Sequence, residues 1–190
     1  QPEGTGRGVP GALPVPPGEL APSLTSKSEL PCGRAARLGY VPPLPLQRGG
    51  DRAPVPIDWI RARALLHEHG LELPTESQWE YAARGGETGP WPLEDRADVA
   101  DGALAEAWKV QGFRMSAAVA AFHDGWVDAA PVGSFRPNGY GLHDTLGNVS
   151  EWCLDPFVYR GYSSVTPRSG DGLRDSAFGE GDRVVRGGSF

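Results

Sequence analysis

Residues 137–152, Pro-Asn-Gly-Tyr-Gly-Leu-His-Asp-Thr-Leu-Gly-Asn-Val-Ser-Glu-Trp, constrain the fold more than any other stretch of this chain. They hold too many Gly and Asx residues for a regular element, and too many large apolar groups for a solvated loop. Asp144 and Glu151 bracket Gly147-Asn148, a pair that favours a turn with a left-handed residue. Such a turn brings two carboxylates and the carbonyls between them toward one point. This arrangement suits a hard cation such as calcium, and it equally suits acids that cap backbone amides.

The length, charge and cysteine count limit the classes of protein to which the chain can belong. Its 190 residues are enough for one domain with a substantial core. A formal net charge of −6 argues against a nucleic-acid or anionic-membrane surface. No apolar run approaches the length that a bilayer requires. Cys32 and Cys153 are the only thiols, too few for a disulfide framework or a cysteine-based zinc site.

The first predicted helix follows Asp58, which is a plausible N-cap. Apolar-face positions then recur at helical spacing, and Gly70 supplies the C-terminal stop. The positions on this face are Ala62, Leu65, Leu66 and His69.

The second predicted helix begins at a capping box formed by Thr75 and Gln78, and Gly85-Gly86 ends it. Its buried stripe consists of Trp79, Ala82 and Ala83. We place Tyr81 in the core as well.

Two strands are predicted in the second half of the chain, one over residues 130–135 and one that opens at Arg183. The second strand is interrupted by the end of the sequence, so we expect the chain to be cut short there. Residues 1–36 are rich in Pro and Gly and lack apolar periodicity, which predicts a disordered arm or a degenerate N-terminal part. We therefore expect a domain over residues 37–190 that is incomplete at its C-terminus.

Five separate segments form a set with consistent order and spacing. They are residues 73–86, 131–135, 137–144, 147–152 and 186–190. Together they resemble the formylglycine-generating enzyme, or sulfatase-modifying factor, family, and five segments are far more specific than one. The likeness runs over residues 39–190.

The resemblance implies an α+β, C-type-lectin-like fold with two helices, small antiparallel sheets and much irregular structure. It also implies two structural calcium sites, each built from carboxylate and carbonyl oxygens, which are the ligands that calcium prefers. The ligands of the first site would be Asp144, Gly147, Val149 and Glu151. Those of the second would be Asp98, Val99, Asp124 and Trp126.

Enzymes of the family, as the resemblance implies, use molecular oxygen to oxidise a cysteine of a sulfatase peptide to formylglycine. They do so with copper held by two thiolates, the ligands that soft cuprous copper requires. The pair follows the Gly-Gly-Ser segment in a Cys-x4-Cys arrangement, which neither Cys32 nor Cys153 matches. We therefore assign no catalytic residue, expect copper only in a complete catalytic parent, and predict that the chain as given is inactive.

Three functions remain open, because a fold alone does not select among them. The chain is a partial formylglycine-generating domain whose partner is a sulfatase peptide, or it is a noncatalytic C-type-lectin-like module. Such a module binds or displays another protein or peptide, as the variable proteins of diversity-generating retroelements do. The third alternative is the C-terminal domain of an ergothioneine-type sulfoxide synthase.

Overall fold

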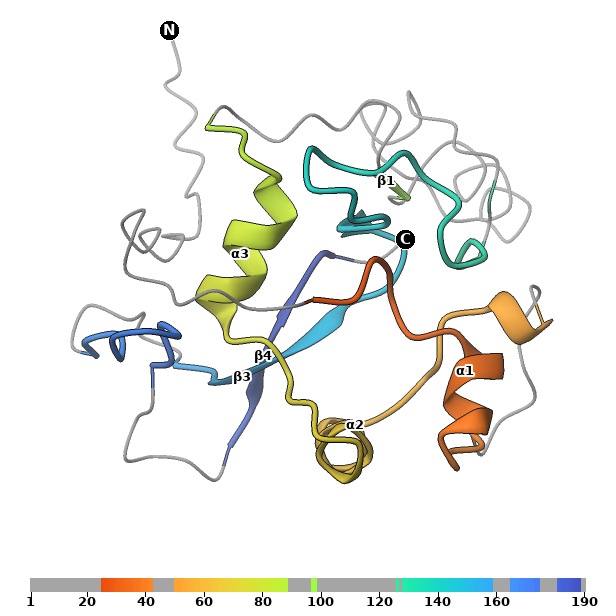
Figure 1. The fold of residues 1–190 in the computed structure, drawn as a ribbon, viewed down its shortest axis with the longest axis horizontal. Helices are drawn as coiled ribbons and strands as arrows, with labels where there is room; N and C mark the ends of the chain where they lie inside the picture. The colour runs from red at the N-terminus through yellow and green to blue at the C-terminus, as the bar shows by residue number, and fades with distance from the viewer. Residues whose placement is uncertain are drawn as a thin grey trace, which may run out of the picture.

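The computed structural model describes residues 25–42, 50–88, 97–98, 126, 128–158, 165–174 and 181–188 (Figure 1). Within these ranges the helices are α1 (Cys32–Arg37), the 3-10 helix η1 (Gly50–Arg52), α2 (Trp59–Glu68) and α3 (Glu76–Arg84). The strands are β1 (Ala97–Asp98), β2 (Leu146–Gly147), β3 (Glu151–Pro156) and β4 (Arg183–Arg186). The α+β class is confirmed, with α1 and η1 added to the two predicted helices. In this part of the chain, no helix is both long and apolar enough to cross a membrane.

Helix α2 begins and ends where its local sequence predicts. The Asp58 carboxylate accepts a hydrogen bond from the backbone N–H of Arg61 at 2.9 Å, which satisfies one of the free donors of the first turn. Gly70, with φ +70°, lies just past the last turn. Ala62 and Leu65 are buried as expected, whereas His69 is exposed.

Helix α3 has both halves of the predicted capping box. The Thr75 hydroxyl accepts from the backbone N–H of Gln78, whose side chain accepts from the backbone N–H of Thr75. Trp79 and Ala83 are buried, which confirms the core face of the helix. The placement of Tyr81 in the core is wrong, since the residue is 55% exposed. It follows Trp79 by two residues, and helical positions two apart face different directions.

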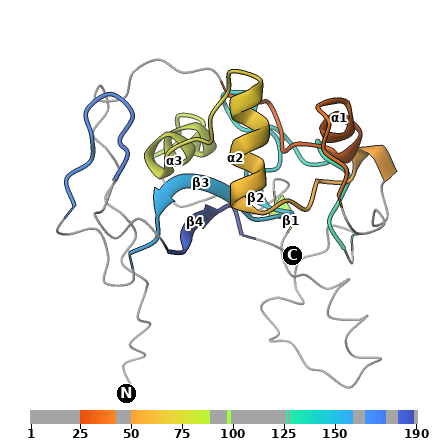
Figure 2. The ribbon, with the colours of Figure 1, turned by 90° about the horizontal axis from the view of Figure 1, so that it is seen from below.

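The core lies between α3 and the antiparallel pair of β3 and β4. Trp79 and Ala83 pack there with Cys153 and Val184. Figure 2 shows α3 lying above these two strands. The pairing of β3 with β4 confirms the strand predicted to open at Arg183. The β1 and β2 strands form a separate parallel pair, in which Asp98 lies opposite Gly147.

Residues 130–135 do not form the predicted strand. They form an irregular turn in which Gly133 has φ +79°. The backbone N–H groups of Gly133 and Phe135 donate to the Asp144 carboxylate, and those groups are the donors that a strand partner would need. The prediction is wrong because a side chain more distant in sequence takes these hydrogen bonds.

Residues 27–37 pack against the rest of the described chain. The Lys27 carbonyl accepts from the His143 N–H at 2.8 Å, and the Leu30 carbonyl accepts from the Val55 N–H at 2.9 Å. Ala35 in α1 is fully buried. The end of the predicted arm therefore provides packed backbone that reaches the 137–152 stretch.

Asn138 fastens that stretch to the end of α3. Its side-chain amide donates to the carbonyls of Ala82 and Ala83 at 2.8 and 2.9 Å. These carbonyls belong to the last turn, where the regular i+4 amide partners are lacking, although the Gly85 N–H also donates to the Ala82 carbonyl. Its side-chain oxygen accepts from the N–H groups of Tyr140 and Leu142. One buried amide therefore sets the position from which the following loop starts.

We predict that Asn138→Ala lowers the free energy of unfolding by about 1–3 kcal/mol, because it leaves part-buried backbone groups without partners. Urea denaturation measures the change. Ser134→Ala is the matched control, since Ser134 is exposed and its hydroxyl donates to the Pro131 carbonyl, and a change within about 0.5 kcal/mol is expected there. Equal losses in the two variants would contradict the role assigned to Asn138.

Candidate functional site

Asp144 is buried and has φ +57°, a conformation that Asp tolerates better than most residues. One carboxylate oxygen accepts from the Gly133 N–H, and the other accepts from the Phe135 N–H at 3.1 Å. Asp144 therefore caps backbone amides, as one of the two sequence interpretations proposes. Each carboxylate oxygen has two acceptor sites, so these bonds leave room for a further ligand.

Glu151 is the first residue of β3, and its environment differs from that of Asp144. One of its carboxylate oxygens accepts from the indole N–H of Trp79 at 3.2 Å. Burial raises the pKa of this carboxyl to about 7, and the nearby charge of Asp144 acts in the same direction, while the Trp79 hydrogen bond opposes both.

The carbonyls of Gly147 and Val149 converge beside Gly187. A methyl group added at Gly187 would lie 3.5 Å from the Val149 oxygen and 4.0 Å from the Gly147 oxygen. It would also lie 3.7 Å from the ring of Trp79, which bonds Glu151. The two carbonyls of the predicted first site and the ring of Trp79 therefore lie close to the same face of Gly187. Trp79 in turn donates a hydrogen bond to the Glu151 carboxylate of that site.

Glu29 is a third carboxylate at this site, and sequence reasoning missed it. Only 8% of the residue is exposed. It accepts from the side-chain amide of Asn148 at 2.7 Å and from the Val149 N–H at 3.4 Å. Burial raises the pKa of Glu29 to about 9, reinforced by the charges of Glu151 and Asp144 and opposed by its two hydrogen bonds. Its separation of 119 residues from Asn148 left no local signal that could have found it.

The three carboxylates have no basic partner among the described residues. Neither Glu29, Asp144 nor Glu151 forms an ion pair there with Lys, Arg or His. Over the same ranges, no three His, Cys, Asp or Glu side chains are spaced as a ready-made set of metal ligands. The site must therefore either keep protons on its carboxyl groups or bind an added cation. Backbone carbonyls would be among the ligands of such a cation.

The second predicted calcium site lies mostly outside the described residues. Val99 and Asp124 fall there. Asp98 belongs to β1 and lies opposite Gly147 of the first site, while Trp126 is 38% exposed. Pairing of β1 with β2 thus places the backbone of one predicted site beside the other.

Comparison with known proteins identifies the family. Residues 41–190 match the sulfatase-modifying factor enzyme 1-like domain. The chain belongs to this family. It is 37% identical over 139 residues to the formylglycine-generating enzyme of Streptomyces coelicolor, covering 72% of this chain and 41% of that enzyme. It therefore spans about two fifths of the length of that relative.

A second relative and a solved structure widen the comparison. The chain is 37% identical over 110 residues to the inactive C-alpha-formylglycine-generating enzyme 2 of Bos taurus, covering 54% of this chain and 33% of that protein. The fold is similar to that of Treponema denticola variable protein 1, with a TM-score of 0.56 and 20% identity over 85% of this chain and 70% of that one. The C-type-lectin-like fold class is thus confirmed, with a parallel β1–β2 pair in addition to the antiparallel β3–β4 pair.

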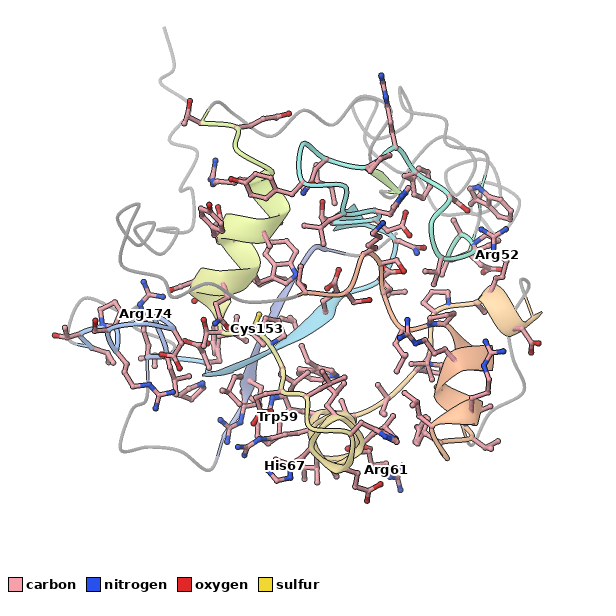
Figure 3. The ribbon with its side chains drawn as sticks, in the orientation of Figure 1. Arg52, Trp59, Arg61, His67, Cys153 and Arg174 are labelled. Atoms are coloured by element: carbon pink, nitrogen blue, oxygen red, sulfur yellow. The ribbon has the colours of Figure 1, made fainter. Side chains whose placement is uncertain are left out.

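The two thiols of this sulfatase-modifying-factor domain are buried in different surroundings. Cys153 lies in the core, and Figure 3 shows it between α3 and the β3–β4 pair. Cys32 begins α1 and its sulfur faces the Pro54 carbonyl. Burial raises the pKa of both thiols, so thiolate is disfavoured at each. Both are free cysteines, and neither environment fits a copper dithiolate.

We predict that, in excess chelator, the domain loses stability as the pH rises from about 5 to 8. Glu29 and Glu151 have folded-state pKa values of about 9 and 7, against an ordinary value of 4.5. In this window the unfolded chain binds fewer protons than the folded chain, so deprotonation favours unfolding. Each carboxyl contributes a slope of up to about 1.4 kcal/mol per pH unit below its folded pKa.

Urea denaturation at several pH values measures this slope. Glu151→Gln is the matched variant. It should remove the part of the slope of unfolding free energy against pH that Glu151 contributes, which lies mainly below about pH 7. It should leave the part that Glu29 contributes, which continues above that pH. A free energy of unfolding that stays constant or rises over this interval would contradict the burial of uncompensated carboxylates.

Proposed function

We propose that this chain is a calcium-stabilised scaffold of the formylglycine-generating type, and that residues 1–190 contain no oxidase centre. The observation that carries the proposal is a group of three carboxylates, Glu29, Asp144 and Glu151, next to two converging carbonyls. Glu29 and Asp144 are buried, and none of the three forms an ion pair with a basic group among the described residues. When Glu29, Asp144 and Glu151 are all ionised, they place three negative charges in a poorly solvated region, which raises the pKa values of Glu29 and Glu151. A divalent cation beside the Gly147 and Val149 carbonyls would offset this charge.

The donor types at the site suit calcium better than softer metals. The ligands we propose are the Asp144 and Glu151 carboxylates with the carbonyls of Gly147 and Val149, all of them hard oxygen atoms. Calcium also tolerates the irregular geometry that backbone carbonyls impose, whereas magnesium demands a near-ideal octahedron. Asp98, Val99, Asp124 and Trp126 remain the proposed ligands of a second calcium ion.

The residues present do not fit copper. Cuprous copper needs thiolates, and both thiols of the chain are buried, with raised pKa values, in separate packing environments. Cys153 contacts Trp79 and Val184, so its burial belongs to the core. We therefore derive no redox step from these 190 residues.

For the complete protein we propose oxidation of a cysteine in a sulfatase peptide to formylglycine. The observation that favours this activity is the 37% identity to the Streptomyces coelicolor enzyme over 72% of this chain. The similarity to an inactive relative supports the alternative, which is that the protein is a noncatalytic binding module. In either case residues 1–190 would form the structural scaffold, with calcium as its structural ion.

We predict that removing calcium lowers the melting temperature, because ligand bound only to the folded state stabilises it by mass action. Melting curves in calcium and in excess chelator measure the shift. Asp144→Ala and Glu151→Ala should each reduce the calcium-dependent shift strongly. In chelator, each variant should lose only the hydrogen bonds of its own carboxylate, so Asp144→Ala should still melt below the unsubstituted chain.

Glu72→Ala is the control for these variants, since Glu72 is an exposed acid that pairs with Arg63 away from the site. It should keep the full calcium-dependent shift. Identical melts with and without calcium in the unsubstituted chain would contradict the proposal. Losses from the two site variants that add independently of calcium would instead indicate two separate backbone caps.

We also predict that residues 1–190, supplied with cuprous copper and oxygen, convert no cysteine of a sulfatase peptide to formylglycine. The complete protein should convert it under the same conditions. Mass spectrometry of the peptide detects the product. Conversion by residues 1–190 alone would contradict the exclusion of copper, and no conversion by the complete protein would favour the noncatalytic alternative.

A further inference from the structure

Glu29 lies outside the part of the chain that matches the family and outside the proposed ligand set, yet it contacts the centre of the 144–151 loop. One carboxylate oxygen accepts from the Asn148 side-chain amide at 2.7 Å, and the other accepts from the Val149 N–H at 3.4 Å. Glu29 therefore holds one side chain and the next backbone amide at the same time.

Asn148 forms hydrogen bonds both to Glu29 and to the backbone of Ala130. It is fully buried and has φ +59°. Its side-chain oxygen accepts from the Ala130 N–H at 2.8 Å, and its amide also reaches the Ala130 carbonyl at 3.4 Å. Because Asn148 lies between Gly147 and Val149, the bonds that fix it also fix the backbone that presents both carbonyls beside Gly187.

The carboxyl group of Glu29 also lies close to the other two carboxylates of the proposed ion site. Its neighbours include the carboxylates of Glu151 and Asp144, and it forms no ion pair with a basic group in the described ranges. In the ionised form, a carboxylate at this position repels the other two in a region of low polarity, so the ionised form is disfavoured without a cation. A cation bound nearby would attract all three carboxylates and so offset their mutual repulsion.

We propose that Glu29 is a positioning residue of the calcium site, which orients the Gly147 and Val149 carbonyls through Asn148 and strengthens binding of the ion with its charge. The inference rests on the calcium site proposed above. It links the N-terminal segment to the site, since Lys27 and Leu30 on either side of Glu29 bond His143 and Val55 through their backbones. Outer ligand-shell partners of this kind orient the groups that bind the metal.

The test compares the unsubstituted chain with Glu29→Gln and Glu29→Ala by calorimetric titration with calcium chloride. Glu29→Gln keeps the size of the side chain and removes its charge, and we expect calcium affinity to fall by a factor of about 10 to 100. In excess chelator the same variant should melt at a higher temperature than the unsubstituted chain, since the repulsion is relieved. Glu29→Ala also removes the hydrogen bonds and should bind calcium at least as weakly as Glu29→Gln.

Glu72→Gln is the matched control and should leave both the affinity and the melting temperature in chelator unchanged, because Glu72 pairs with Arg63 on the surface. A purely structural role for Glu29 would lower the melting temperature of Glu29→Gln equally with and without calcium, and that result overturns the inference. Normal calcium affinity in Glu29→Gln overturns it as well and leaves the calcium site standing. No calcium binding by the unsubstituted chain would overturn the site and the inference together.

Discussion

The buried carboxylates around the 144–151 loop each hold a different part of the fold. Asp144 holds the turn at residues 131–135, Glu151 holds the indole of Trp79 in α3, and Glu29 holds Asn148 from the N-terminal segment. For Glu29 and Glu151, burial and the neighbouring negative charges favour the neutral form, while their hydrogen bonds favour the charged form. Because the same groups join three segments, whatever neutralises their charge also determines how firmly those segments stay together.

A second group of buried charges in the same molecule is neutralised by its own residues. Glu76 lies 3.7 Å from a guanidinium nitrogen of Arg174 and 3.8 Å from one of Arg186. Figure 3 shows Arg174 at the end of α3 where that helix begins. Asp155, which is fully buried as well, accepts hydrogen bonds from the backbone N–H groups of Glu76 and Arg174. Around the 144–151 loop, by contrast, three carboxylates lie close to one another with no ion pair to a basic group within the described residues, an arrangement that an external cation would relieve.

The sequence predicted features that depend on neighbours a few residues away. The caps of α2 and α3 follow from Asp58 and Thr75, because a capping side chain bonds an amide within the same turn. The predicted strand at 130–135 failed, and Glu29 was missed, because their partners lie far away along the chain. The convergence of Asp144 and Glu151 was expected from the turn between them, but the cap on residues 133 and 135 that Asp144 provides was only one of two open interpretations.

The site also determines where the end of the described chain lies. The Gly147 N–H donates to the Gly187 carbonyl at 2.7 Å, and the Ser150 hydroxyl donates to the Gly188 carbonyl at 3.2 Å. Gly187 has φ +90° and faces the two converging carbonyls, so the backbone leaves β4 directly beside the proposed ion. An ion that orders the 144–151 loop therefore also orders Gly187 and Gly188, which follow β4. Since the family resemblance places the copper cysteines soon after the Gly-Gly-Ser segment, calcium would affect oxidation in the complete protein by positioning backbone, without contacting the reacting groups.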